Sequence, residues 1–137
     1  MNTSVDLTDN GLRTVSSNHN VQITADRLEG ILKEKGMNVF ARVNHAAGAE
    51  KIGESLRPTE LIIFGNPQTG TPLMQSQQTV AIDLPQKMLV WEDVQKNVWL
   101  SYNAPDYLVN RHGINGCDEL INKISTALDN IARQATE

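Results

Sequence analysis

The sequence predicts an α+β domain with a largely antiparallel sheet, and three observations lead to this class. An amphipathic pattern of helical spacing lies near the start of the chain, and a longer one lies at its end. Between them are several short runs rich in β-branched and aromatic residues, which are typical of strands. These runs follow one another, instead of alternating regularly with helices as they would in a parallel α/β sheet.

The first part of the chain predicts a tail, a strand and a helix. Residues 1–10 are polar, so we expect a flexible N-terminal tail, followed by a single domain over residues 11–137. Residues 12–17 have the short, β-rich composition of a strand. The next segment predicts an amphipathic helix with Thr24 as its N-cap, and Gly36 ends this helix.

Two further strands are predicted before the middle of the chain. Residues 37–44 alternate between apolar and polar side chains, which indicates a strand with one buried face. That face is expected to carry Met37, Val39, Ala41 and Val43. After one or two helical turns within residues 45–57, the apolar run at residues 59–65 predicts a strand covered on both faces.

The second half predicts a hairpin between a loop and two helices. The aromatic and branched runs at residues 86–93 and 97–103 predict a β-hairpin, with Trp91 and Trp99 on its core face. A short helix is expected between residues 104 and 113, with a proline at its first position. The last helix has apolar residues at three- and four-residue spacing: Leu120, Ile121, Ile124, Ala127, Leu128 and Ile131.

Composition and charge argue against several classes of function. A chain of 137 residues has the length of one ordinary domain. The net charge of −4 and the pI of 5.3 give no basic field that would hold nucleic acid. No apolar run approaches the length of a membrane span, and the first residues lack the pattern of a signal peptide. We therefore expect a soluble, cytoplasmic protein with neither a nucleic-acid nor a membrane partner.

The segment GNPQTGTPLM, at residues 65–74, is a candidate ligand loop. Its glycine spacing matches the Walker A motif, but Thr71 and Pro72 stand where that motif needs Lys and Ser or Thr, so we predict no nucleotide site. Asn66, Thr69 and Thr71 offer hydrogen-bonding groups to a different ligand beside a strand end. In the alternative interpretation, these side chains satisfy their own turns and the apolar residues that follow fill the core.

A second candidate group lies in the short helix near residue 110. Tyr107, Arg111 and His112 place polar tips close together, with Tyr107 and Arg111 four residues apart on one helical face. They are candidates for lining a pocket that binds an anion or a carboxylate. The alternative is an ordinary amphipathic turn that packs on Leu108 and Val109.

Two residue pairs form the basis of an enzyme hypothesis. Cys117, the single cysteine, precedes the last helix and lies five residues after His112, so a nucleophilic Cys–His pair is one option. His45 with Asp83 is the other. A metal site built from His45, His112 and Asp83 stays open, but no histidines have metal-ligand spacing on one helical face, so we assign neither a metal nor a cofactor.

Three motifs in order, GMNVFARVNHAAGAEKIGESLRPTELIIFGNPQTGTPLM, IDLPQKMLVWED and YLVNRHGI, closely resemble the bacterial family called domain of unknown function 302. The resemblance covers about residues 20–133. It implies a β-α-β4-α arrangement similar to the TATA-binding-protein-like group, in which the helices pack on one face of a curved antiparallel sheet. It also implies a homodimer. It carries over no catalytic residues, because the family has no agreed mechanism.

These observations lead to one main functional hypothesis. We expect a homodimeric binding module in which residues 65–74 and 107–112 edge a pocket for a small organic ligand or a partner peptide. The alternatives are a small enzyme that uses one of the two pairs above, and a structural dimer without a ligand.

Overall fold

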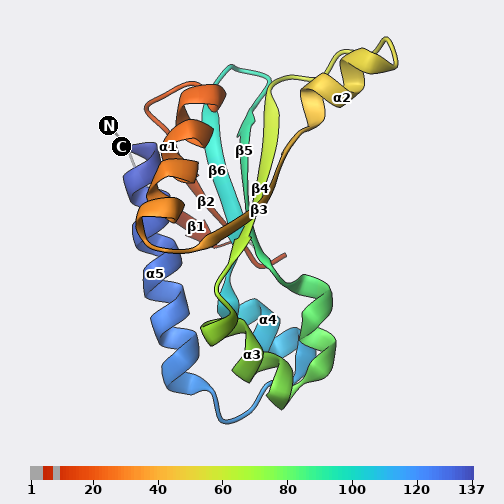
Figure 1. Cartoon of the computed structure of the whole chain (residues 1–137). Helices are drawn as coiled ribbons and strands as arrows, with labels where there is room; N and C mark the ends of the chain where they lie inside the picture. Colours follow the sequence, from red (N-terminus) through yellow and green to blue (C-terminus); the bar gives the residue numbers. More distant parts are fainter. Residues whose placement is uncertain (1–4, 8–9) are drawn as a thin grey trace.

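The computed structural model describes residues 5–7 and 10–137, and its strands form one six-stranded antiparallel sheet (Figure 1). The strand order across the sheet is β1-β2-β6-β5-β4-β3. In chain order the strands are β1 (Val5–Leu7), β2 (Leu12–Ser16), β3 (Asn38–Asn44), β4 (Thr59–Gly65), β5 (Gln86–Glu92) and β6 (Val98–Asn103). The predicted hairpin is formed by β5 and β6, which pair antiparallel.

The helices occupy three places around the sheet (Figure 1). Two long helices lie along one face of the sheet, α2 projects from one end, and α3 and α4 gather at the opposite end. The helices are α1 (Val21–Glu34), α2 (His45–Lys51), α3 (Pro67–Ser76), the 3₁₀ helix η1 (Gln78–Asp83), α4 (Pro105–His112) and α5 (Asp118–Thr136). The order β2-α1-β3-β4-β5-β6-α5 confirms the expected β-α-β4-α arrangement with helices packed on one face.

The core lies between the sheet and the two long helices. Along β4, side chains alternate between buried and half-buried, with Ile62 and Phe64 fully buried on the helix side. They meet Leu28 of α1 and Ile131 of α5 in one cluster of buried residues. Each such side chain contributes about 1.5–3 kcal/mol by burial, so this layer of the core dominates the stability of the domain. Among the described residues, no helix has the length and apolar character needed to span a membrane.

The N-terminal segments differ from the predictions in two ways. Within the expected tail, Val5–Leu7 form β1, which pairs with β2, and the remaining tail residues 1–4 and 8–9 lie outside the described residues. The N-cap of α1 is Asn20, not Thr24: the side-chain oxygen of Asn20 accepts a hydrogen bond from the backbone N–H of Ile23. The helix starts earlier than predicted because Val21 and Thr24 extend its buried stripe by one turn.

Strand β3 contains a bulge that reverses the predicted faces. Its register with β4 shifts between Val39 and Ala41, so Phe40 has no partner in the ladder. Because an extra residue turns all later side chains to the other face, Ala41 does not share a face with Val39, and Arg42 points toward α1. The simple alternation of period two was wrong for this strand.

The side of the sheet away from α1 and α5 is apolar and half-buried, and we call it the open face. It carries Leu61, Ile63, Leu89, Trp91 and Trp99. The sequence had suggested that Trp91 and Trp99 face the core, and this prediction is wrong. Their rings lie 6.5 Å apart, and the indole N–H of Trp91 donates to Ser101 Oγ at 2.9 Å. Both faces of β4 were predicted to be covered, but only the side chains on the helix side are buried, and those on the open face are half-buried.

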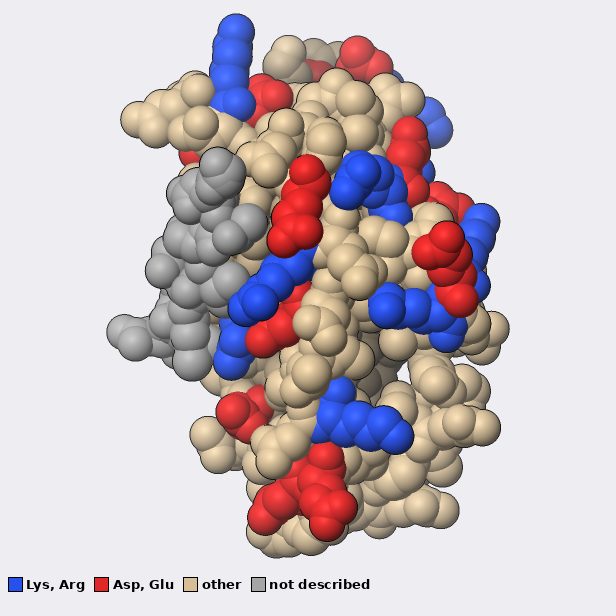
Figure 2. Space-filling model, turned by 90° about the vertical axis from the view of Figure 1, so that its left-hand side faces the viewer, with Lys and Arg blue, Asp and Glu red and all other residues tan. Residues whose placement is uncertain are grey.

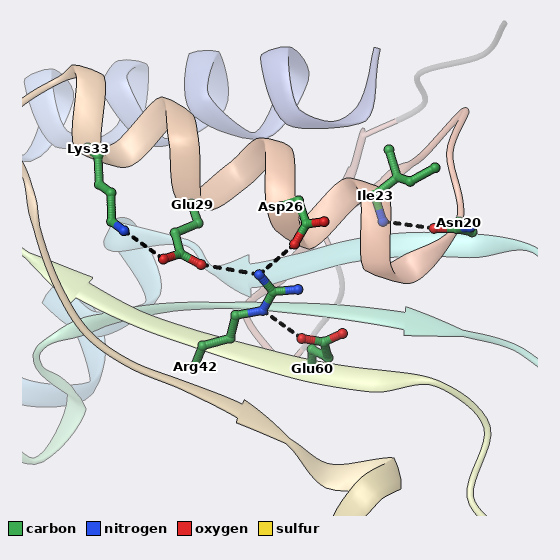
Figure 3. A network of polar contacts seen from close by, with 7 residues as sticks. All are labelled: Asn20, Ile23, Asp26, Glu29, Lys33, Arg42 and Glu60. Carbon is green, nitrogen blue, oxygen red and sulfur yellow. Dashed lines mark hydrogen bonds and ion pairs between the residues drawn. The ribbon is translucent and has the colours of Figure 1, made fainter.

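Arg42 connects two strands and a helix on the core side (Figure 3). Its Nε donates to Glu60 of β4 at 2.7 Å, and its Nη1 contacts Asp26 and Glu29 of α1 at 2.7 and 3.1 Å. The hydrogen bond to Glu60 is the largest cause that raises the pKa of Arg42. Hydrogen bonds from Lys33 and then from Arg42 lower the pKa of Glu29. The network fixes α1 against the sheet through charges as well as apolar contacts.

The surface over α1 and α5 has mixed charge (Figure 2). On this face, the basic and acidic side chains of the described residues are interspersed instead of forming areas of one sign. A nucleic-acid backbone would need clustered Lys and Arg, so this face does not fit that kind of partner.

Candidate functional site

The segment after β4 forms helix α3, although its glycines and prolines predicted a loop. Asn66 caps the helix, since its side-chain oxygen accepts a hydrogen bond from the N–H of Gln68 at 2.9 Å. Pro67 occupies the first helical position, where a missing N–H is harmless. The hydroxyl of Thr69 donates to the carbonyl of Asn66 at 3.0 Å, and Leu73 is buried in the core. These contacts match the interpretation in which the polar residues satisfy their own turn.

The same helix also forms one wall of a cavity of about 260 Å³. Strands β3 to β5 meet α3 and η1 at this end of the sheet, and α5 closes the inner side. The lining residues are Phe40, Gly65, Asn66, Pro67, Thr69, Gly70, Thr71, Leu73, Met74, Ala81, Leu84, Pro85, Gln86 and Ile124. The sequence therefore identified three residues that line this cavity: Asn66, Thr69 and Thr71.

The chemistry of this cavity is apolar and uncharged. None of the lining residues carries a charge, and aliphatic, aromatic, proline and methionine side chains predominate. Polar groups come from Asn66, the two threonines and Gln86. The cap uses the side-chain oxygen of Asn66, which leaves its amide nitrogen as a hydrogen-bond donor. The arrangement suits a largely apolar ligand with few polar groups.

The other predicted site residues do not line this cavity. Arg111 and His112 instead contact Asp83, the last residue of η1. Arg111 Nη1 lies 3.1 and 3.0 Å from the two oxygens of Asp83, and His112 Nε2 lies 2.6 Å from one of them. The ring of Tyr107 packs directly over Gly11, so closely that a Cβ atom added to Gly11 would lie 2.2 Å from the ring. The predicted ligand set is thus divided among three places: the cavity, the contact with Asp83 and the contact with Gly11.

The enzyme pairs expected from the sequence are not formed. His45 begins α2, at the end of the sheet opposite to α4, so it does not approach Asp83 (Figure 1). The two ring nitrogens of His112 bond to Thr79 and Asp83, and Cys117 packs against the core. Among residues 5–7 and 10–137, no three His, Cys, Asp or Glu side chains lie together as metal ligands would.

Sequence reasoning placed His112 and Asp83 together only as parts of a metal site with His45, and it missed Thr79 altogether. The imidazole nitrogens lie 2.6 Å from Asp83 Oδ2 and 3.1 Å from Thr79 Oγ1. Asp83 and His112 are 29 positions apart, and Thr79 and His112 are 33 apart. No periodicity links such positions, so only the packing of η1 on α4 reveals the group.

Curated relatives of the chain carry names that refer to an ion channel. The fluoride-specific ion channel FluC 1 of Brucella suis biovar 1 (strain 1330) is 53% identical over 106 residues, which are 77% of this chain and 42% of that protein. The fluoride-specific ion channel FluC 2 of Brucella melitensis biotype 1 is also 53% identical, over 77% of this chain and 39% of that protein. The chain thus spans about two fifths of the length of these relatives.

A solved structure has the same fold. The crystal structure of an uncharacterized conserved protein DUF302 from Bacillus stearothermophilus matches with a TM-score of 0.81, over 91% of this chain and 98% of that one, at 21% sequence identity. The model of the family described as domain of unknown function DUF302 matches residues 13–131, nearly the whole chain. The chain therefore belongs to the DUF302 family.

Proposed function

We propose that the chain is a cytoplasmic, homodimeric binding module whose cavity between β4, α3 and η1 takes a small, mainly apolar organic ligand. The cavity itself is the observation that carries this proposal. Its volume of about 260 Å³ is just below the range of about 300–1,000 Å³ that is usual for ligand pockets, so the ligand is small.

The lining also narrows the class of ligand. A fluoride ion, the ion named for the Brucella relatives, needs cationic or several N–H donor groups to replace its water. The cavity offers Leu73, Met74, Leu84 and other apolar groups instead, and no charged residue lines it. We therefore assign the cavity an organic ligand with one or two hydrogen-bonding groups, which the amide of Asn66 and the hydroxyl of Thr71 would meet.

The open face supports the homodimer. A shallow hollow of about 430 Å³ on this face is lined mainly by apolar groups, with Lys87 among its polar residues; the lining residues are Leu12, Leu61, Lys87, Leu89, Trp91, Ser101, Tyr102 and Asn103. A mainly apolar surface on a sheet is unfavourable in water, and it usually marks a surface that another molecule covers. A second copy presents the same apolar face, so a two-fold pairing of the open faces buries both.

Gly70 provides the test of the cavity. A Cβ atom at Gly70 would point toward Leu84 Cδ1 and Met74 Cε at 3.8 and 3.9 Å, and the backbone there does not have a positive φ. Gly70→Leu is therefore expected to fill the cavity without straining α3. Gly30→Leu is the matched control, because Gly30 lies in helix α1 and a Cβ atom added there would meet no other atom within 4 Å.

The probe is N-phenyl-1-naphthylamine, an uncharged apolar fluorophore. We expect it to bind the wild type and Gly30→Leu with equal affinity, and Gly70→Leu at least tenfold more weakly. Equal binding by Gly70→Leu, or none by the wild type, would contradict the proposal.

Native mass spectra of protein purified gently from its own host report the subunit number and any retained ligand, and a monomer would overturn the dimer. Trp91→Glu is expected to split the dimer.

A further inference from the structure

A second group of side chains lies where η1 meets α4, and none of its members lines the cavity. It joins the hydroxyl of Thr79 to the imidazole of His112, and this imidazole to the carboxylate of Asp83. The two distances are 3.1 Å from Thr79 Oγ1 to Nδ1 and 2.6 Å from Nε2 to Asp83 Oδ2. Hydroxyl, imidazole and carboxylate thus stand in the order that activates a hydroxyl nucleophile in many hydrolases.

The hydrogen bonds set the tautomer of the imidazole. Asp83 is ion-paired with Arg111 Nη1, so its oxygens accept hydrogen bonds. In the neutral ring, the nitrogen that faces this carboxylate, Nε2, then carries the proton. Nδ1 consequently presents its lone pair to the hydroxyl of Thr79. This is the orientation in which His112 can accept a proton from Thr79.

The surroundings favour attack by Thr79 on a molecule from solution. The His112 side chain is only 7% exposed, whereas Thr79 lies at the surface. In a 3₁₀ helix, residues three positions apart share a face, so Ile82 lies on the same side as Thr79. The side chain of Ile82 is 75% exposed. It offers an apolar contact for the acyl part of a substrate beside the hydroxyl.

We propose that Thr79 is a nucleophile for acyl transfer from small esters with apolar acyl groups. Thr79 Oγ1 forms a bond to the acyl carbon, its proton passes to His112 Nδ1, and the bond between the acyl carbon and the alcohol oxygen breaks. The alcohol leaves with the proton from His112. A water molecule then hydrolyses the acyl-threonine, releases the carboxylic acid and restores the hydroxyl. Asp83 is a positioning residue that holds the ring and its tautomer.

The same hydrogen bonds would also arise if they only fastened η1 to α4, so the test must detect chemistry. The probe is a fluorophosphonate, which forms a covalent bond with activated hydroxyls, and the modified residue is mapped by mass spectrometry of peptides. We expect the adduct on Thr79 in the folded wild type. General-base assistance is worth about 10²-fold or more, so His112→Gln is expected to lower the labelling rate by about that factor.

Three variants separate this chemistry from loss of structure. Thr79→Ser keeps the hydroxyl and is expected to be labelled, whereas Thr79→Val has nearly the same shape and is not. Thr126→Val is the matched control, because Thr126 is an exposed threonine on α5, and it is expected to be labelled on Thr79 at the wild-type rate. Melting curves confirm that each variant is folded.

The role of Asp83 has its own spectroscopic test. The imidazole N–H that bonds to Asp83 is expected to give a strongly downfield proton resonance, which Asp83→Asn removes. Absence of an adduct on Thr79 in the wild type, or equal labelling rates in His112→Gln, would overturn the proposal. Gly70→Leu is expected to be labelled like the wild type, so failure here and failure of the cavity proposal are distinguishable.

Discussion

Replacement of Arg42 by methionine tests whether charges fix α1 to the sheet. Methionine keeps most of the apolar stem but removes the guanidinium. The contact from Nε to Glu60 is the most buried of the three, with side chains that are 25% and 11% exposed. Its loss costs about 1.5–3 kcal/mol, the usual range for a hydrogen bond to a charged group. The partner carboxylate would remain nearly buried without its cation.

The other two contacts of Arg42 add less. Asp26 is 57% exposed, and Glu29 also bonds to Lys33, so each contact is worth about 0.5 kcal/mol or less. We therefore expect Arg42→Met to lower the free energy of unfolding by about 2–3 kcal/mol. For a domain of this size about 4 °C corresponds to 1 kcal/mol, so the melting temperature should fall by roughly 10 °C.

The assay is urea unfolding at pH 7, followed by the fluorescence of Trp91 and Trp99. A double-mutant cycle with Glu60→Gln isolates the direct interaction, for which we expect a coupling energy above about 1 kcal/mol. Arg133→Met serves as the control, because this arginine is exposed at the end of α5 and should change stability by less than about 0.5 kcal/mol. A similarly small effect of Arg42→Met, or a coupling energy near zero, would refute the reasoning.

Two further predictions concern pH and backbone strain. The hydrogen bond from Lys33 is the main cause that lowers the pKa of Glu29 from 4.5, so the stability that Glu29 contributes is fully present above pH 4.5 and is lost as the pH falls through the lower pKa of the folded state. In acid unfolding, the stability of Glu29→Gln should therefore decline less steeply below pH 4.5 than that of the wild type. Parallel curves would contradict this. Gly11 and Gly36 both have a positive φ, of 83° and 77°, but only a Cβ at Gly11 would strike the Tyr107 ring. Alanine at either position should lower the free energy of unfolding by roughly 1 kcal/mol through backbone strain, and Gly11→Ala should lower it by at least about 1 kcal/mol more than Gly36→Ala. Urea unfolding measures both losses, and equal losses would argue against the ring contact.

Sequence periodicity was sufficient where one face of an element packs on one partner. The stripe that ends at Ile131 predicted α5, and the two aromatic runs predicted the β5–β6 hairpin. Helix α5 follows a single period from end to end, so local pattern and tertiary packing agree there. The aromatic runs located the hairpin but put Trp91 and Trp99 on the wrong face. The β-α-β4-α order that the family resemblance implied is also correct, and it is formed by β2, α1, the strands β3 to β6, and α5.

The errors arose where the structure depends on a bulge, a helix cap or a distant contact that the local sequence pattern does not show. The extra residue in β3 altered the face of Arg42, and nothing in the alternation signals such a bulge. The composition of residues 65–74 suggested a loop, but the cap at Asn66 and the burial of Leu73 stabilise a helix despite Pro72. The contact between Asp83 and His112 joins distant parts of the chain and has no local signal.

The bulge in β3 makes one wall of the cavity independent of the pairing of the sheet. Phe40 lines the cavity but pairs with no residue of β4, while Val39 and Ala41 pair with successive residues, Phe64 and Ile63. A different side chain at Phe40 would reshape the wall of the cavity without altering the ladder or the direction of Arg42. Under the proposed function, a substitution at this one position would therefore change which ligand fits while the pairing of the sheet stays the same.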